Sequence, residues 1–165
     1  MLAYKIVMVG DFGVGKTSLV KRFVDNSFSE EYLSTIGVSI SKKIMQNSTL
    51  MLWDIEGRTE FKPVFKQYFL GAKGFIVVAD ITREDTIESI EEHIKLCHSI
   101  IKDAPVVIAL NKSDMQASFD QAKLDALTTL SPSIVNILTT SAKSGEGVEE
   151  IFHSLDDFIV EHLNR

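Results

Sequence analysis

The stretch GDFGVGKT at residues 10–17 follows the pattern G-x-x-x-x-G-K-[ST]. It comes directly after an apolar run at residues 5–9 and directly before a helical pattern of apolar residues. Glycines at these positions let the backbone wrap closely around phosphate groups, and the N–H groups of a helix N-terminus favour anions. Lys16 is expected to reach the β- and γ-phosphates of a nucleotide, and the Thr17 hydroxyl to ligate Mg²⁺. A glycine-rich strand-to-helix turn is the alternative, but so many constrained positions favour a phosphate loop.

Three apolar runs rich in valine and isoleucine, at residues 5–9, 74–80 and 105–111, do not alternate with polar residues. Strands that are buried on both faces of a parallel sheet have this pattern. A weaker fourth run lies at residues 134–140, and helical patterns lie between the runs and after the last one, over residues 148–163. This alternation predicts a doubly wound α/β sheet.

Residues 37–54 break the alternation. Two β-like stretches, at residues 38–45 and 49–53, flank a polar tripeptide and leave no room for a helix between them. They are expected to form an antiparallel hairpin at one edge of the sheet. The prediction is therefore one domain over residues 1–165, with a mostly parallel six-stranded sheet, one antiparallel edge strand and five helices.

Isoleucines at positions 87, 90, 94 and 101 predict one helix after the second run. His93 and Cys97 on this helix have the spacing of two metal ligands. No further cluster of ligand-type residues accompanies them, so they and His98 are expected to be exposed or half-buried helix residues. The glutamates at positions 88, 91 and 92 are expected to form a solvated helix face.

The composition excludes several classes of protein. The 165 residues include 17 Lys and Arg against 23 Asp and Glu, and the net charge of −6 argues against a nucleic-acid partner. The one cysteine, Cys97, permits no intrachain disulfide and favours a reducing compartment, so a cytoplasmic location is expected. The apolar runs are far shorter than the roughly 20 residues of a membrane-spanning helix. Neither end shows an apolar signal segment or a cysteine to prenylate, so no direct lipid anchor is expected, and a partner would have to bring the chain to a membrane.

The residues NKSD at 111–114 follow the third apolar run at the carboxyl edge of the expected sheet, where open α/β sheets bind ligands. The Asp114 carboxylate can accept hydrogen bonds from N1–H and the 2-amino group of guanine, whereas adenine would leave it unpaired. Asn111 can bond the purine edge, and the stem of Lys112 can lie over the ring. A polar turn at a strand end is the alternative for this motif alone. The residues SAK at 141–143, after the weaker fourth run, are a second match to a guanine-binding pattern. The NKSD and SAK motifs together disfavour an ATP-dependent kinase.

Together the motifs at residues 10–17, 111–114 and 141–143 resemble those of the Ras superfamily of small GTPases, over essentially the whole chain. The segment STIG at residues 34–37 and the pair Trp53-Asp54 look most like Rab and Ras-type members. The resemblance implies a P-loop GTPase domain that binds GTP or GDP with Mg²⁺ and acts as a molecular switch. The implied partners are an effector, an exchange factor and an activating protein, and the implied state is a monomer or a nucleotide-dependent dimer.

The resemblance also implies roles for individual residues. The phosphates would be held by Gly13, Val14, Gly15, Lys16, Thr17 and Ser18. The base would be held by Phe28, Asn111, Lys112, Asp114, Ser141, Ala142 and Lys143. Thr35 would join Thr17 as a magnesium ligand and sense the γ-phosphate. Asp54 would support the ion through water, and the Gly57 N–H would contact the γ-phosphate.

The second switch of the family usually reads D-T-A-G-Q, whereas residues 54–58 read DIEGR, so Arg58 replaces the glutamine that orients the attacking water. A guanidinium has donors but no acceptor, so hydrolysis is expected to be slow. Two hypotheses remain open. Arg58 either swings inward as an internal arginine finger, with Glu56, Glu60 or a partner orienting the water, or is a solvent-exposed residue of a protein that stays GTP-bound. The catalytic candidates are Lys16, Thr35, Gly57 and Arg58.

Two further departures concern partners. Phe12 stands where Ras has a glycine and Rabs a small residue, so it either blocks an incoming arginine or packs beside Phe61 or Pro63. Both outcomes would weaken the usual action of an activating protein. The segment at residues 37–54 is several residues shorter than the corresponding hairpin of Rabs, so the identity of a partner is not expected to transfer.

Overall fold

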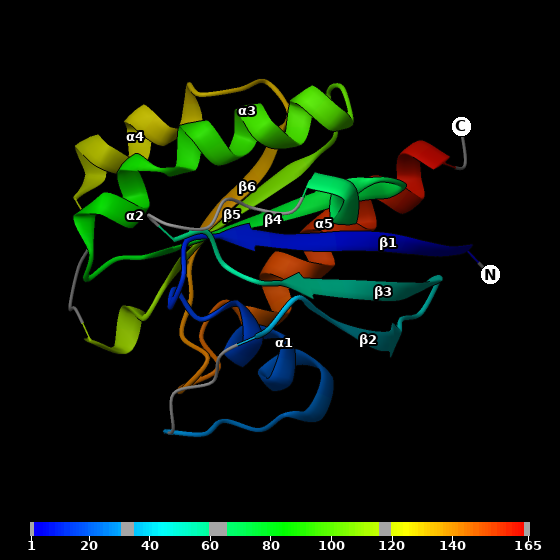
Figure 1. Ribbon diagram of the computed structural model, residues 1–165. Helices are drawn as coiled ribbons and strands as arrows, with labels where there is room; N and C mark the ends of the chain where they lie inside the picture. The colour runs from blue at the N-terminus through cyan, green and yellow to red at the C-terminus, as the bar shows by residue number, and fades with distance from the viewer. Residues whose placement is uncertain (1, 31–34, 60–65, 116–119, 164–165) are drawn as a thin grey trace.

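The strands form one sheet in the order β2-β3-β1-β4-β5-β6 within the computed structural model, which describes residues 2–30, 35–59, 66–115 and 120–163 (Figure 1). The strands are β1 (Leu2–Gly10), β2 (Val38–Ile44), β3 (Ser48–Ile55), β4 (Ala72–Asp80), β5 (Val106–Asn111) and β6 (Ile134–Thr139). β2 runs antiparallel to β3, and the other neighbouring pairs are parallel. The prediction of a mostly parallel six-stranded sheet with one antiparallel edge strand is confirmed.

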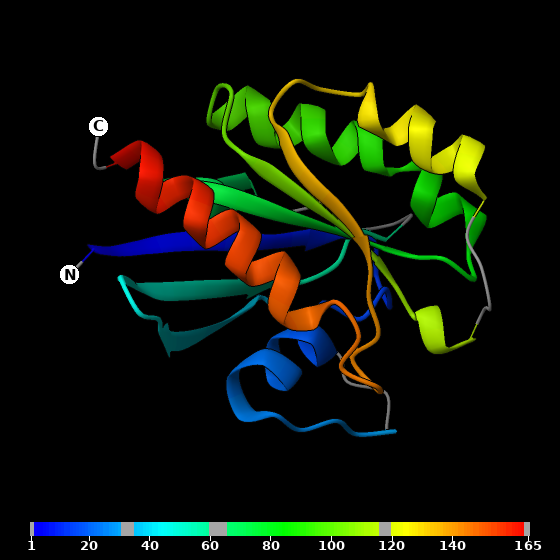
Figure 2. The same ribbon diagram turned by 180° about the vertical axis from the view of Figure 1, so that it is seen from behind.

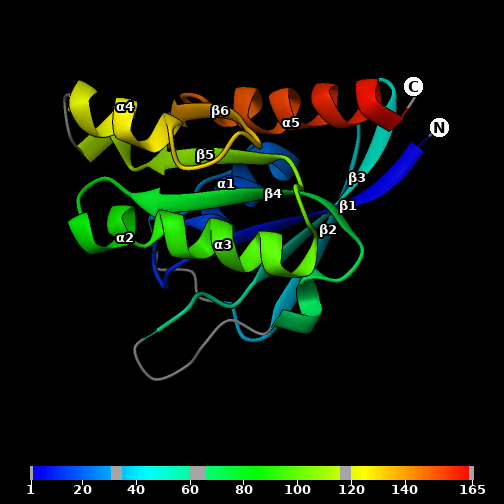
Figure 3. The same ribbon diagram turned by 90° about the horizontal axis from the view of Figure 1, so that it is seen from above.

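Helices cover both faces of this sheet (Figures 2 and 3). One face carries α1 (Lys16–Asp25) and α5 (Val148–Leu163), and the other carries α2 (Glu84–Glu88), α3 (Ile90–Ile100) and α4 (Gln121–Thr128). These are the five α-helices of the described ranges, beside two short 3₁₀ segments at Lys66–Phe69 and Ser113–Met115. Successive residues of β1 point to opposite faces, so Ile6 and Met8 join one core cluster, and Val7 and Val9 join the other.

The prediction of one helix over residues 87–101 is wrong in two respects. α2 ends and α3 begins on either side of Ser89, and Ile101 lies beyond the end of α3. The Ser89 hydroxyl donates a hydrogen bond of 2.9 Å to the Asp85 carbonyl and accepts one from Arg58. The same kind of bond, from the Ser154 hydroxyl to the Glu150 carbonyl, lies within the unbroken α5, so the serine bond by itself does not explain the break at Ser89, which apolar spacing does not reveal.

The sheet brings the sequence motifs together. The carboxyl ends of parallel strands meet at one edge, where open α/β sheets bind ligands. β1 leads into the loop at residues 10–15, β3 into residues 56–58, β5 into residues 112–115 and β6 into residues 140–143. Among the described helices, none has the length and apolar character needed to cross a membrane.

Candidate functional site

The phosphate loop joins β1 to α1 and depends on glycine at two positions. Gly13 and Gly15 adopt positive φ angles of 79° and 101°, which side chains disfavour. A Cβ on Gly15 would collide with the side-chain amide of Asn111. The loop is therefore folded closely against the end of β5. α1 begins directly after it, and the first N–H groups of a helix have no partner within the helix.

Lys16 lies inside this loop and is only 6% exposed. Its ammonium donates to the carbonyls of Gly10 and Asp11 at 3.3 and 3.1 Å. Burial lowers the pKa of Lys16 to about 8, although the charges of Asp54 and Asp11 oppose the shift. The structure thus encloses a cation within the loop that the sequence identifies as a phosphate site.

The three residues predicted to hold magnesium meet beside the start of α1. Thr17 Oγ1 donates to Asp54 Oδ2 at 2.6 Å and lies 2.6 Å from Thr35 Oγ1, which donates to the same carboxylate oxygen at 3.1 Å. Burial raises the pKa of Asp54, while the hydrogen bond from Thr17 and the charge of Lys16 oppose that rise.

The donor set at this point fits Mg²⁺. The second oxygen of Asp54, Oδ1, is buried and has no hydrogen-bond partner among the described residues. Hydroxyl and carboxylate oxygens are the ligands that Mg²⁺ prefers, with phosphate oxygens completing its shell. The described residues contain no group of three or more His, Cys, Asp or Glu side chains that could hold a metal, so a cation here would depend on hydroxyls, one carboxylate and a bound phosphate.

The second-switch residues Gly57 and Arg58 lie against the phosphate loop. A Cβ on Gly57 would be 2.7 Å from the Phe12 backbone nitrogen and 2.8 Å from Lys16 Nζ, so only glycine fits. Arg58 is not the solvent-exposed residue of the second hypothesis, because its side chain is 24% exposed and pairs with Asp11. No pattern in the sequence marks the acidic and polar partners that hold the guanidinium.

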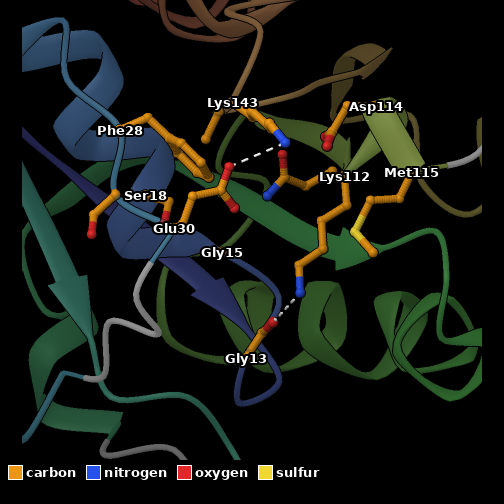
Figure 4. A pocket seen from close by; sticks show the side chains of 12 residues that line it. Gly13, Gly15, Ser18, Phe28, Glu30, Lys112, Asp114, Met115 and Lys143 are labelled. Carbon is orange, nitrogen blue, oxygen red and sulfur yellow. Dashed lines mark hydrogen bonds and ion pairs between the residues drawn. The ribbon is translucent and has the colours of Figure 1, made fainter.

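A pocket of about 340 Å³ lies beside the phosphate loop (Figure 4). Its walls include nine of the predicted residues: Gly13, Gly15, Ser18, Phe28, Asn111, Lys112, Asp114, Ala142 and Lys143. Ser29, Glu30 and Met115 complete the walls and were not predicted. Glu30 pairs with Lys143 at 3.1 Å across the pocket, as the dashed line in Figure 4 shows, and no sequence pattern marks that contact.

The base-motif residues connect the pocket to the phosphate loop. Asn111 donates to the Val14 carbonyl at 2.9 Å and accepts from Thr140 at 3.0 Å, so both ends of its amide bond to protein. The Lys112 ammonium donates to the Gly13 carbonyl at 3.0 Å and pairs with Asp80 at 3.0 Å. The observed partners of Asn111 and Lys112 are groups of the protein itself, whereas the prediction concerned contacts to a purine.

Asp114 and Ser141 meet from different strand ends. The buried Ser141 hydroxyl donates to Asp114 Oδ1 at 2.8 Å. Arg22 of α1 supports the neighbouring segment, because its Nε donates to the Ala142 carbonyl at 2.8 Å and its Nη2 to the Lys143 carbonyl. Sequence reasoning missed Arg22, since its contact lies far along the chain.

Phe12 is an exposed residue of the phosphate loop. Phe12 is 44% exposed, and its carbonyl accepts a hydrogen bond of 2.9 Å from Arg83. The suggested neighbours Phe61 and Pro63 lie outside the described residues, as do Glu60 and Ser34.

His93 and Cys97 are fully buried, so the prediction that they are exposed or half-buried is wrong. His93 can be buried because its ring nitrogen Nε2 lies 2.9 Å from Asp11 Oδ1. His98 is half-buried and bonds to the Ala104 carbonyl at 3.0 Å, as the prediction allowed.

Comparison with known proteins agrees with this geometry. The model of the Ras family matches residues 5–161. Ras-related protein Rab-13 of the dog, Canis lupus familiaris, is 36% identical over 160 residues, which cover 92% of this chain and 77% of the relative. Ras-related protein RabC of Dictyostelium discoideum is 34% identical, with 93% and 82% of the two chains covered. Ras-related protein SEC4 of Saccharomyces cerevisiae is 33% identical, with 97% and 76% covered. The predicted resemblance is confirmed, and the chain belongs to the Ras family.

Proposed function

We propose that the chain is a molecular switch that binds GTP or GDP with Mg²⁺ and hydrolyses GTP slowly. The observation that carries this proposal is a convergence at one sheet edge. The buried Lys16, the Thr17–Thr35–Asp54 cluster and the pocket beside Asp114 lie next to one another there. Membership of the Ras family supports GTP binding and GTPase activity in general.

In this proposal the phosphates lie against the N–H groups of residues 13–18, with the Lys16 ammonium beside the β- and γ-phosphates. Bound Mg²⁺ would neutralise charge on the phosphate oxygens. Thr17 and Thr35 would hold it directly, and the buried Asp54 carboxylate would accept hydrogen bonds from its water ligands. Thr35 and Gly57 would both contact the γ-phosphate region, so loss of that phosphate releases two segments and changes the surface that partners meet.

The base would lie in the pocket between Phe28 and the side chains of Lys112 and Lys143. Asp114 would accept the two donors of guanine, while Ser141 fixes the orientation of its carboxylate by the 2.8 Å hydrogen bond. Ala142 would border the base, held in place by Arg22 through its carbonyl. A nucleotide that lacks one of the two donors would leave the carboxylate partly unpaired.

Slow hydrolysis follows from the groups around the second switch. Arg58 offers no acceptor for the attacking water. Glu56 has an acceptor, but its carboxylate accepts from the Gly37 N–H at 3.3 Å, and its own N–H donates to the Gly37 carbonyl at 2.8 Å. A second candidate function is therefore a GTP-binding interaction protein with negligible hydrolysis, controlled by nucleotide exchange. The ion pairs of Arg58 with Asp11 and Glu92 favour it, because a guanidinium that is held by two carboxylates does not approach the phosphates.

Phosphate release in a single turnover separates the two functions. Protein loaded with GTP and Mg²⁺ is freed of excess nucleotide, and released phosphate is followed over time. Release that is measurable but slower than about 10⁻⁴ s⁻¹, the order of intrinsic rates in Ras, supports a slow enzyme. Absence of release over a day supports the interaction protein, and failure to load with GTP contradicts both.

Cellular context stays a prediction. An effector, an exchange factor and an activating protein are expected partners of a switch of this family. A cytoplasmic location, with recruitment to a membrane by a partner, and a monomer or nucleotide-dependent dimer are likewise predictions.

A further inference from the structure

The guanidinium of Arg58 is bound by side chains from the phosphate loop, from α3 and from Ser89, the residue between α2 and α3. Its Nε donates to Asp11 Oδ1 at 3.1 Å, and its Nη2 donates to the Ser89 hydroxyl at 2.8 Å. Its Nη1 pairs with Glu92 at 2.7 Å. Every nitrogen of the planar group thus has a partner, in a forked geometry that a lysine could not reproduce. We call Arg58 with Asp11, Ser89 and Glu92 the Arg58 clamp.

Asp11 is the buried centre of this clamp. It is 8% exposed, and the same oxygen that accepts from Arg58 lies 2.9 Å from Nε2 of His93, which is 1% exposed. Burial alone would raise the pKa of Asp11, but the hydrogen bond to His93 and the charge of Arg58 lower it below its usual value. The carboxylate therefore stays charged, and His93 of α3 holds it in place by the 2.9 Å contact.

The backbone of Arg58 is tied to the phosphate loop as well. Its N–H donates to the Gly10 carbonyl at 3.3 Å, and its carbonyl accepts from the Phe12 N–H at 2.9 Å. Gly57 precedes it directly and approaches Lys16 so closely that a Cβ would lie 2.8 Å from Nζ. The contacts that fix the position of Arg58 therefore also fix the position of Gly57 beside the Lys16 ammonium.

These contacts also bear on the arginine-finger hypothesis. To reach a phosphate, Arg58 would have to leave two carboxylates and a hydroxyl, one of the carboxylates being buried. Asp11 would then lose its arginine partner while it stays buried, and removal of one partner of a buried charge is unfavourable. The geometry favours an arginine that holds the second switch in place.

We propose that Arg58 is a positioning residue whose clamp holds the Gly57 N–H ready for a γ-phosphate, and thereby strengthens the binding of GTP relative to GDP. This inference rests on the proposed function as a guanine-nucleotide switch. A donor that is already in place loses little freedom when it binds, so its contact adds more to affinity. GDP has no γ-phosphate, so the clamp does not contribute to its binding.

The test compares dissociation of two fluorescent nucleotides, GDP and a non-hydrolysable GTP analogue, both with Mg²⁺. Arg58→Ala is expected to speed release of the analogue about tenfold, the size of a charge-assisted hydrogen-bond network, and to change GDP release less than about twofold. Ser89→Ala combined with Glu92→Gln removes two partners that lie outside the phosphate loop and should give a smaller shift in the same direction. Arg58→Lys should restore only part of the difference.

Glu91→Gln is the matched control. The Glu91 carboxylate lies on the same helix as Glu92 but pairs with Lys95 and not with Arg58. Its removal should leave both release rates at the wild-type values. Equal acceleration of both nucleotides in the clamp variants, or no change in either, overturns the clamp. A fall in single-turnover hydrolysis in Arg58→Ala, with an unchanged ratio of release rates, overturns it in favour of a finger. Wild-type protein that binds neither nucleotide overturns the proposed function itself.

Discussion

The side-chain amide of Asn111 donates a hydrogen bond of 2.9 Å to the carbonyl of Val14, and so joins the base motif to the phosphate loop. The same side chain accepts from Thr140 at 3.0 Å, which ties in the end of β6. Three segments that are far apart in the sequence therefore share one buried amide. We therefore expect the proposed phosphate and base sites to act as a single unit in which a change in one affects the other.

Asn111→Ala is expected to weaken the binding of GTP and the binding of GDP to similar extents. It leaves the Val14 carbonyl and the Thr140 hydroxyl without this partner, at about 1–3 kcal/mol per buried group, and so loosens the loop that both nucleotides use. Equilibrium titration with fluorescent GDP and GTP measures the effect. Unchanged affinity for both nucleotides would contradict the coupling of the two sites.

Asp114→Ala is expected to abolish discrimination against a base that lacks the 2-amino group. In the proposed function the wild-type carboxylate would accept two donors of guanine but only one of hypoxanthine, a difference of about 1–3 kcal/mol. Competition between GTP and ITP for the wild-type and variant proteins measures it. A variant that keeps the wild-type preference for GTP would show that Asp114 does not read the base.

Much of this architecture is predictable from sequence, because its determinants are local. Valine and isoleucine runs without alternation marked β1, β4 and β5, and glycines at positions needing positive φ marked the phosphate loop. The position of the base motifs at strand ends then followed from the parallel sheet.

The remaining features depend on pairing across the fold. The burial of His93 requires Asp11 opposite it, and the position of Arg58 requires Ser89 and Glu92 on another element. No spacing along a single sequence connects residues 31 or more positions apart, as Arg58 and Ser89 are. For the same reason Arg22, which holds the 142–143 segment, escaped sequence reasoning.

Affinity for nucleotide phosphates is expected to fall as the pH rises above about 8, where the free protein begins to lose the proton of Lys16. The pKa of Lys16 is lowered by burial, so the ammonium is present below that pH and lost above it. A bound polyanion favours the protonated form, so each further pH unit should cost up to about tenfold in affinity. Titration with GDP at constant ionic strength between pH 6.5 and 9 measures it, and a flat profile would contradict the assigned role of Lys16.

Arg58→Gln is expected to raise the rate of GTP hydrolysis about tenfold or more. Glutamine supplies both a donor and an acceptor at the position where the arginine has only donors, so it can orient the attacking water. Fully loaded protein is compared in a single turnover, so that changes in affinity do not enter the rate. A variant no faster than the wild type would show that Arg58 is not the cause of slow hydrolysis.

The most direct test of the central claim is the single-turnover release of phosphate from wild-type protein loaded with GTP and Mg²⁺. A switch that binds GTP but hydrolyses it slowly should load with GTP and release phosphate more slowly than about 10⁻⁴ s⁻¹, to leave bound GDP. Release at or above that rate, or a protein that cannot be loaded with GTP, would contradict the account.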